Sequence, residues 1–311
     1  MFDLPDSKIL VTGARGFLGR HLIAHLQGLG CGKLVAPSSQ ECDLRSWDQT
    51  EQLIESQAPD LVIHLAAVVG GIAANQRHPG KFFYENAIMG IQLMEIARLC
   101  GVKKFVTVGT VCAYPKFTPT PFCEESLWDG YPEETNAPYG LAKKMLLVQG
   151  QAYRQEYAFN SIYLLPTNLY GPGDNYDPES SHVIPAMIHK FAQAKASGQS
   201  VVELWGDGSP TREFLYVKDA ARGIALAAQH YDEGEPVNLG SGQEASIKEL
   251  AERVAHEMGY AGKLVWDTSK PNGQPRRCLD LSRSRAFGFE AQTSLSEGLR
   301  ETLVAYRASF Q

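Results

Sequence analysis

Residues 8–19 read KILVTGARGFLG, and this stretch decides the fold. Ile9, Leu10 and Val11 form a short apolar run of the kind found in buried strands. Glycines follow at once, and apolar residues at helical spacing continue from Phe17 to Leu26. The stretch therefore predicts a strand, a glycine turn and a helix in direct succession, which is the repeating unit of a parallel α/β fold.

The glycines of this turn, Gly13, Gly16 and Gly19, are spaced for a dinucleotide phosphate. The first permits a tight turn, the second lets backbone approach a pyrophosphate, and the third lets helix and strand pack closely. The N-terminus of the helix adds the positive end of its dipole. Glycine turns without a ligand are common. Because this one lies between a strand and a helix, it predicts a bound dinucleotide.

The same alternation continues along the chain. Apolar strand-like runs occur near residues 33–37, 60–67, 103–109 and 160–171, and helical patterns cover residues 46–56, 80–100 and 139–156. Such alternation specifies a parallel sheet covered by helices on both faces. We therefore predict a doubly wound, Rossmann-type α/β fold.

A change of composition marks the end of this first domain. Residues 171–185, GPGDNYDPESSHVIP, are rich in Gly, Pro, Asp and Ser, as loops are. We predict a dinucleotide-binding Rossmann domain over residues 1–175 and a smaller α/β substrate-binding lobe over residues 176–311. A strand-helix-strand segment near residues 213–240 is expected to return to the first sheet. Ser246 and Glu249 predict a capping box at the start of a later helix.

The overall composition bounds the class of protein. The 311 residues are 44% hydrophobic and carry a formal net charge of −6, with no basic block that suggests nucleic acid. Apolar runs fall short of the ~20 residues that a membrane span needs, and the first residues lack the pattern of a signal peptide. The cysteines show no metal-ligand spacing. We expect a cytoplasmic protein with no metal, nucleic-acid partner or membrane partner.

The residues after the second strand bear on which dinucleotide binds. NAD-binding chains usually place Asp or Glu there, which binds the ribose hydroxyls and repels a 2′-phosphate. Here the sequence has Ser38 and Ser39, and Arg15 in the glycine turn can pair with the extra phosphate. A solvated surface cation is the alternative for Arg15. Asp43 is expected beside the adenine. The sequence favours NADPH.

Three residues are candidates for carbonyl reduction. Tyr139 and Lys143 in PYGLAKK are four positions apart and share a helix face. An ammonium group beside the phenol is expected to lower the pKa of Tyr139, which can then exchange a proton with a carbonyl oxygen. Thr110 ends a preceding strand and supplies a hydroxyl. A surface Tyr/Lys pair is the alternative.

With these residues the chain resembles the extended short-chain dehydrogenase/reductase family, whose catalytic Ser/Thr, Tyr and Lys match Thr110, Tyr139 and Lys143. Motifs over nearly the whole chain resemble those of the GDP-L-fucose synthases in that family: HLAAVVGGIAAN, VCAYPK, ETNAPYGLAKK, PTNLYGPGDNY, SSHVIPAMI, LWGDGSPTREFLYVKD and DTSKPNGQPRR. The resemblance implies NADPH-dependent epimerisation at C3 and C5 and reduction at C4 of GDP-4-keto-6-deoxy-mannose. It also implies that Cys112 and His182 are the acid/base pair of the epimerisation.

The chemistry of a thiol and an imidazole fits that role. The C4 ketone acidifies the protons on both neighbouring carbons, so one pair of groups can serve two inversions. Both groups titrate near neutral pH and can remove a proton from one face and return one to the other. A buried, inert thiol is the alternative for Cys112, and a helix cap is the alternative for His182. His64, in the apolar run LVIHLAA, is expected to be a core histidine.

The resemblance implies further contacts. The expected cofactor-binding residues are Gly13, Arg15, Gly16, Phe17, Leu18, Gly19, Ser38, Ser39, Asp43, Leu65, Ala66, Ala67, Tyr139, Lys143, Pro166, Asn168, Leu169 and His182. The expected substrate-binding residues are Asn168, Lys190, Trp205, Arg212 and Lys270. Arg212 and Lys190 would offer cations to the diphosphate. A core aromatic is the alternative for Trp205.

The chain departs from the pattern of these enzymes at four positions. Thr110 stands where Ser is usual, Val68 where Lys is usual, and Ser39 and Lys190 where Arg is usual. Threonine keeps the hydroxyl. Another 4-keto nucleotide sugar, such as a GDP-heptose, stays open as the substrate. A nonenzymatic NADP-binding regulator is the alternative from another class, and NADPH oxidation in the presence of a 4-keto nucleotide sugar would distinguish it.

Two long helical patterns predict the state of assembly. The apolar faces of residues 82–99 and 139–153 are suited to pair across a twofold axis, as in similar enzymes. We expect a homodimer joined by a four-helix bundle.

Overall fold

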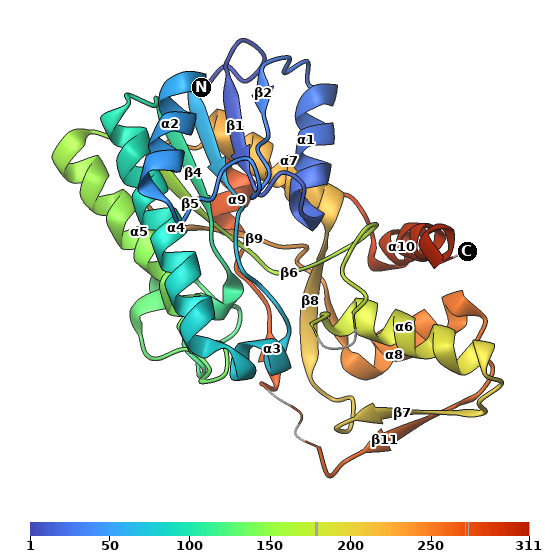
Figure 1. Ribbon diagram of the computed structural model, residues 1–311. Coiled ribbons are helices and arrows are strands. Elements are labelled where there is room, and N and C mark those ends of the chain that lie inside the picture. Colours follow the sequence, from blue (N-terminus) through green and yellow to red (C-terminus); the bar gives the residue numbers. More distant parts are fainter. Residues whose placement is uncertain (178–179, 271, 273, 311) are drawn as a thin grey trace.

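The computed structural model describes residues 1–177, 180–270, 272 and 274–310. One part of the molecule is a sheet with helices on both faces, and the other is a smaller lobe of helices and short strands (Figure 1). The chain passes between the two parts more than once, because strands of the smaller lobe lie in the sequence between residues 161–166 and 237–239, which both belong to the main sheet.

Six parallel strands form the main sheet in the order β2-β1-β3-β4-β5-β9. Their bounds are β1 Ile9–Thr12, β2 Leu34–Val35, β3 Leu61–His64, β4 Lys104–Val108, β5 Ser161–Pro166 and β9 Val237–Leu239. The strand order runs outward in both directions from β1, so the topological switch point lies between β1 and β3. The predicted doubly wound parallel sheet is confirmed.

Helices cover both faces of this sheet. The bounds are α1 Phe17–Gly28 and α7 Val217–His230 on one face, and α2 Trp47–Gln57, α4 Pro79–Leu99 and α5 Ala137–Tyr157 on the other. Alternate residues of β1 enter separate cores: Ile9 and Val11 pack with α1 and α7, and Leu10 packs with α2, α4 and α5. A strand buried on both faces must be apolar throughout, which explains the uninterrupted apolar run.

The smaller lobe has a hydrophobic core of its own. Its elements are β6 Asn168–Tyr170, α6 Val183–Ala196, β7 Val201–Trp205, β8 Thr211–Tyr216, β10 Glu244–Ser246, α8 Ile247–Met258, β11 Lys263–Asp267, β12 Arg276–Arg277 and α10 Leu295–Phe310. Strand β8 is central: β6 and β12 pair with it in parallel and β10 pairs antiparallel. Strands β7 and β11 form a separate parallel pair at the edge of the lobe (Figure 1).

The predicted capping box at the start of α8 is confirmed. The Ser246 hydroxyl accepts the Glu249 backbone N–H at 3.1 Å, and the Glu249 carboxylate accepts the Ser246 backbone N–H at 2.9 Å. Gly259, with a φ of 64°, ends the helix in the left-handed conformation. Local sequence therefore fixes both ends of this helix.

Two strand assignments differ from the sequence prediction. The run at residues 160–171 is divided, because β5 belongs to the main sheet while β6 pairs with β8. Pro166 lacks the N–H that would continue the ladder. Thr167 then links two strands, because its backbone N–H donates to the Leu239 carbonyl of β9 and its hydroxyl donates to the Glu213 carbonyl of β8. In the segment expected to return to the main sheet, β9 does so and β8 does not.

The remaining elements are short. They are α3 Ile72–Arg77, the 3-10 helices η1 Val111–Ala113 and η2 Glu124–Trp128, and α9 Ser282–Ala286. Within the described residues, every helix falls short of the length and apolar character that crossing a membrane requires.

Candidate active site

A large cavity of about 1710 Å³ lies at the carboxyl ends of the main strands. Its walls come from the turns after β1, β2, β3 and β4 and from the smaller lobe, including the residues from Ser180 to Ile184. Ligands of doubly wound sheets bind at this edge, beside the switch point. All residues predicted to be catalytic or cofactor-binding line this cavity.

The glycine turn is shaped by close backbone packing. Gly13 has a φ of 70°, and a Cβ there would lie 2.8 Å from the Ala66 nitrogen. A Cβ on Gly19 would overlap the Gly13 carbonyl. Gly16 is the N-cap of α1 and offers no side chain to the first turn, so the backbone N–H groups of that turn are left for an anion in the cavity. The turn fits a pyrophosphate.

The segment after β2 places charged groups at one end of the cavity. Arg15 Nη2 donates to Glu41 Oε2 at 2.9 Å, and the Ser38 backbone N–H donates to the same oxygen at 2.7 Å. Asp43 pairs with Arg45, and the hydrogen bonds from Arg45 hold the pKa of the Asp43 carboxyl below its usual value. Arg45 also lines the cavity. Arg45 lies outside every motif that the sequence shows, so its place in the cavity was not predicted.

Thr110 and Cys112 meet Tyr139 through a close approach of η1 to α5. Thr110 follows β4 and its hydroxyl accepts the Cys112 backbone N–H at 3.2 Å. A Cβ on Gly140 would overlap the Cys112 carbonyl oxygen, so glycine is needed where α5 meets η1. The Thr110 hydroxyl lies close enough to the Tyr139 phenol to lower the pKa of that phenol. The glycine in PYGLAKK therefore brings the three side chains together.

The electrostatics of Tyr139 and Lys143 correct one expectation. Burial, and the nearby Cys112, raise the pKa of Tyr139 above its ordinary value, against a smaller opposing effect of the Thr110 hydroxyl. Burial has the opposite effect on the pKa of Lys143, which it lowers to about 8. Desolvation disfavours the charged form of both groups and outweighs the attraction expected from the sequence. The phenol of Tyr139 keeps its proton at neutral pH and is suited to donate it.

His182 lies at the N-cap of α6, in the wall formed by the smaller lobe. Its side chain makes no capping hydrogen bond, although capping was the alternative considered from the sequence. His182 is exposed at the cavity surface, and partial desolvation by the protein around it lowers the pKa of its imidazole. The ring is therefore neutral at pH 7 and can accept a proton.

Two arginines face the cavity from the smaller lobe. Burial, together with the neighbouring Arg277, lowers the pKa of Arg212 to about 10. In the described part of the chain, Arg212 donates to the Thr211 carbonyl and Arg277 to the Gln274 side-chain oxygen, both of which are neutral. Two adjacent cations beside neutral partners are suited to an anion. Arg212 was predicted from the sequence and Arg277 was not. Arg277 on β12 lies directly opposite Arg212 on β8 in the parallel register.

The glutamate beside Arg212 holds this wall in place. Glu213 is buried, and its carboxylate accepts the backbone N–H groups of Gly242 and Leu279 at 2.7 and 2.9 Å. It thereby ties β8 to the segments that precede β10 and follow β12.

Three predicted substrate residues lie elsewhere. Lys190 is exposed on α6, and Trp205, at the end of β7, is 68% exposed, so Trp205 is not a core aromatic. Lys270 lies with its ammonium 5.7 Å from the Trp205 ring centroid. The described wall of the cavity includes Asn168 and Arg212 but not these three. Their contact with substrate stays a prediction.

His64 is buried in the core, as expected, with Nδ1 2.8 Å from the Thr12 hydroxyl, but its Nε2 has no hydrogen-bond partner among the described residues. Among the described residues, the structure contains no group of three or more His, Cys, Asp or Glu side chains that could hold a metal ion.

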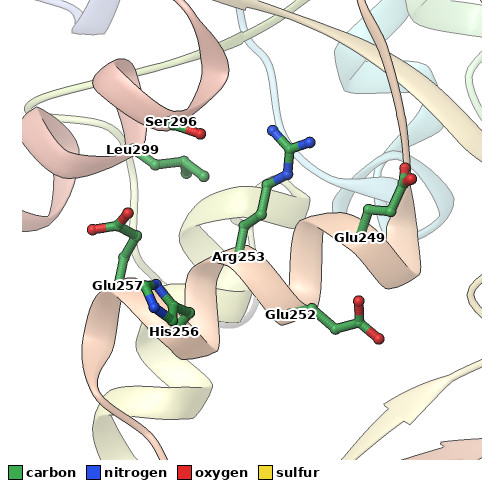
Figure 2. A pocket seen from close by; sticks show the side chains of 7 residues that line it. All are labelled: Glu249, Glu252, Arg253, His256, Glu257, Ser296 and Leu299. Atoms are coloured by element: carbon green, nitrogen blue, oxygen red, sulfur yellow. The ribbon is translucent and has the colours of Figure 1, made fainter.

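A second hollow, of about 440 Å³, lies between α8 and α10 (Figure 2). Figure 2 shows charged side chains along α8, with Ser296 and Leu299 of α10 on the other side. Glu249 is already engaged in the capping box, and none of the predicted site residues lies here.

The chain belongs to the NAD dependent epimerase/dehydratase family, whose model matches residues 9–240. More particularly, it is similar to a probable GDP-L-fucose synthase of Oryza sativa subsp. japonica, with 44% identity over 300 residues that cover 96% of this chain and 92% of the relative. The family resemblance inferred from the sequence motifs is thus confirmed.

Solved structures show the same fold. A GDP-L-fucose synthetase from Naegleria fowleri bound to NADP has a TM-score of 0.92 and 30% identity, covering 100% of this chain and 97% of that one. A GDP-D-glycero-L-gluco-heptose synthase from Campylobacter jejuni, in the presence of NADPH, has a TM-score of 0.90 and 28% identity, covering 99% of this chain and 100% of that one.

Proposed function

We propose that this protein is an NADPH-dependent enzyme that epimerises C3 and C5 of GDP-4-keto-6-deoxy-mannose and reduces C4, producing GDP-L-fucose. The observation that carries the proposal is that one cavity holds two sets of groups. Thr110, Tyr139 and Lys143 form a reducing set, and Cys112 and His182 form a set able to exchange protons. The related GDP-L-fucose synthases support the choice of substrate.

In the reduction, Thr110 and Tyr139 act on the C4 carbonyl oxygen. The Thr110 hydroxyl lies beside the Tyr139 phenol and is placed to orient the same oxygen. Tyr139 donates its proton as the carbonyl becomes an alkoxide. Lys143 is buried one helical turn further along α5. When Lys143 is protonated, its positive charge stabilises the phenolate that Tyr139 becomes after it donates its proton. Bound NADPH supplies the hydride.

In the epimerisation, Cys112 and His182 exchange protons with C3 and C5. Cys112 belongs to η1 beside the main sheet, and His182 belongs to the lobe that forms the other wall. One group removes a proton as the C4 ketone stabilises the enolate, and the other returns a proton to the opposite face. Reduction at C4 then removes the activating ketone and fixes the new configuration.

NMR identification of the product tests the function. The protein is incubated with NADPH and GDP-4-keto-6-deoxy-mannose, and GDP-L-fucose is the expected product. A product reduced at C4 with C3 and C5 unchanged would show that the protein is a reductase without epimerase activity. Failure to oxidise NADPH with any 4-keto nucleotide sugar would favour the nonenzymatic alternative.

A GDP-heptose is the second candidate substrate. The Campylobacter jejuni heptose synthase, which matches this chain over its whole length, favours it. Both candidates share the GDP group and a 4-keto sugar, so they require the same catalytic groups. Comparing kcat/KM for the two sugars distinguishes them.

Arg212 and Arg277 are expected to bind the diphosphate of the substrate. Replacing either with alanine removes charge-assisted hydrogen bonds, so KM for the GDP-sugar should rise about 10- to 100-fold with a much smaller change in kcat. Arg276→Ala is the matched control, because Arg276 pairs with Glu244 and lies outside the cavity wall described. NADPH absorbance measures both constants. An unchanged KM in both variants would contradict this role.

The proposed assembly is a homodimer through α4 and α5. These helices pack against each other at the side of the main sheet away from the smaller lobe (Figure 1). Together they carry Tyr84, Met145 and Val148, which are 61%, 39% and 50% exposed in the single chain. Met145 and Val148 are three positions apart and share one helix face. Burial of such a face against its twofold copy gives a four-helix bundle.

Val148→Arg is expected to convert the dimer to a monomer at micromolar concentration, because it would place a charge at the centre of an apolar interface. Light scattering measures the mass. Val304→Arg, on the exposed face of α10, is the control that should leave the mass unchanged. A monomer mass for the unmodified protein would contradict the proposal.

A further inference from the structure

Two hydrogen-bond donors at the adenosine end of the cavity are bound by a carboxylate of the chain itself. Glu41 Oε2 accepts from Arg15 Nη2 at 2.9 Å and from the Ser38 backbone N–H at 2.7 Å. The Glu41 backbone N–H donates to the Ser38 carbonyl at 3.1 Å and to the Ser38 hydroxyl at 3.3 Å, and these bonds hold the turn that carries Glu41. The carboxylate is therefore positioned by the fold and not by a chance surface contact.

The same donors face the cavity. Arg15, Ser38 and Ser39 all line it, at the end of β2, where the ribose 2′ position of a dinucleotide lies in a doubly wound fold. A guanidinium group and a backbone N–H are the partners that a phosphate uses in proteins. Glu41 thus presents a carboxylate to the groups that would recognise a 2′-phosphate.

Charge and exposure determine how strongly Glu41 holds these donors. Hydrogen bonds from Ser38, and then the charge of Arg15, hold the pKa of the Glu41 carboxyl below its usual value, so it is ionised at neutral pH. The pair is nonetheless open to solvent, with the Arg15 and Glu41 side chains 66% and 59% exposed. Exposed ion pairs contribute little stability, so a phosphate with up to two charges and three acceptor oxygens can displace the carboxylate.

We propose that Glu41 competes with the 2′-phosphate of NADPH for Arg15 and the Ser38 N–H, and so sets how strongly the protein prefers NADPH to NADH. The inference rests on the proposed use of NADPH in this cavity. Binding of the phosphate breaks the Arg15–Glu41 pair and leaves two negative groups close together. NADH has no such phosphate and leaves the pair intact. Glu41 therefore reduces the preference for NADPH over NADH that Arg15 creates.

Nucleotide fragments test this without the catalytic reaction. Isothermal titration calorimetry on the whole protein measures Kd for adenosine 2′,5′-bisphosphate and for 5′-AMP at fixed ionic strength. Glu41→Gln keeps the size of the side chain and its bond to Ser38 but removes the charge. Its Kd for the bisphosphate should fall about three- to tenfold, while its Kd for AMP stays within about twofold.

A double-mutant cycle and a control isolate the effect. In an Arg15→Ala background, Glu41→Gln should change the bisphosphate Kd by less than about twofold, because the shared donor has gone. Glu125→Gln removes the exposed carboxylate of another arginine pair, with Arg283, outside the cavity wall described, and should change neither Kd.

Bisphosphate binding by Glu41→Gln that is unchanged or weaker would overturn the inference, since the carboxylate would then orient Arg15 for the phosphate. The proposed cofactor would survive that result if the unmodified protein still binds bisphosphate more tightly than AMP in a manner that depends on Arg15. Equal affinity of the unmodified protein for both fragments would overturn the inference and the preference for NADPH together.

Discussion

Tyr139→Phe is expected to slow NADPH oxidation by about 10³-fold while the ring protons of the substrate continue to exchange with solvent. Phenylalanine keeps the ring in the cavity wall but removes the proton that reduction of the carbonyl requires. Burial favours the protonated phenol in the native site, so this proton is available at neutral pH. Cys112 and His182, which exchange the ring protons, are unchanged.

The measurement uses deuterium oxide. Deuterium at C3 and C5 is followed by NMR or mass spectrometry, and NADPH by its absorbance. Tyr157→Phe is the control, because Tyr157 is an exposed residue at the far end of the same helix. NADPH oxidation by Tyr139→Phe at a rate near that of the unmodified protein would assign the proton donor to another group. Loss of both activities would indicate that the phenol positions the substrate.

Cys112→Ser is expected to have the opposite profile, with deuterium uptake at C3 and C5 reduced by at least about 10²-fold. Serine is nearly the same size as cysteine but is a much poorer base. Thr110, Tyr139 and Lys143 remain in place, so the variant should slowly reduce the ketone that has not been epimerised. NMR would then show a product with the configuration of the substrate at C3 and C5.

Cys123→Ser controls for the loss of a thiol, because Cys123 is exposed and lies outside the described cavity wall. Undiminished deuterium uptake by Cys112→Ser would mean that this cysteine serves packing alone, and the epimerase role proposed for it would be withdrawn. Opposite profiles for the variants of Tyr139 and Cys112 would instead establish two separable functions in one cavity.

Local sequence determined the parts of this protein that depend on neighbouring residues. The apolar run at Ile9, the glycines after it and the helix from Phe17 specify a strand, a turn and a helix, because each depends on residues at most a few positions apart. The capping box at Ser246 is equally local. Repetition of such units leaves few ways to form a sheet, so the fold class followed from the sequence.

Tertiary structure alone decided the features that depend on distant residues. Strand β8 joined the second sheet, and Arg277 came to lie beside Arg212, through pairing that no local pattern encodes. The pKa of Tyr139 rose because burial depends on the whole fold, and a spacing of four residues from Lys143 contains no information about it. Arg15 meets Glu41, 26 positions later, only because β1 and β2 are neighbours in the sheet. Desolvation and long-range contact are properties of the folded chain. They determine the pKa values and partners of residues that the sequence could identify only as candidates.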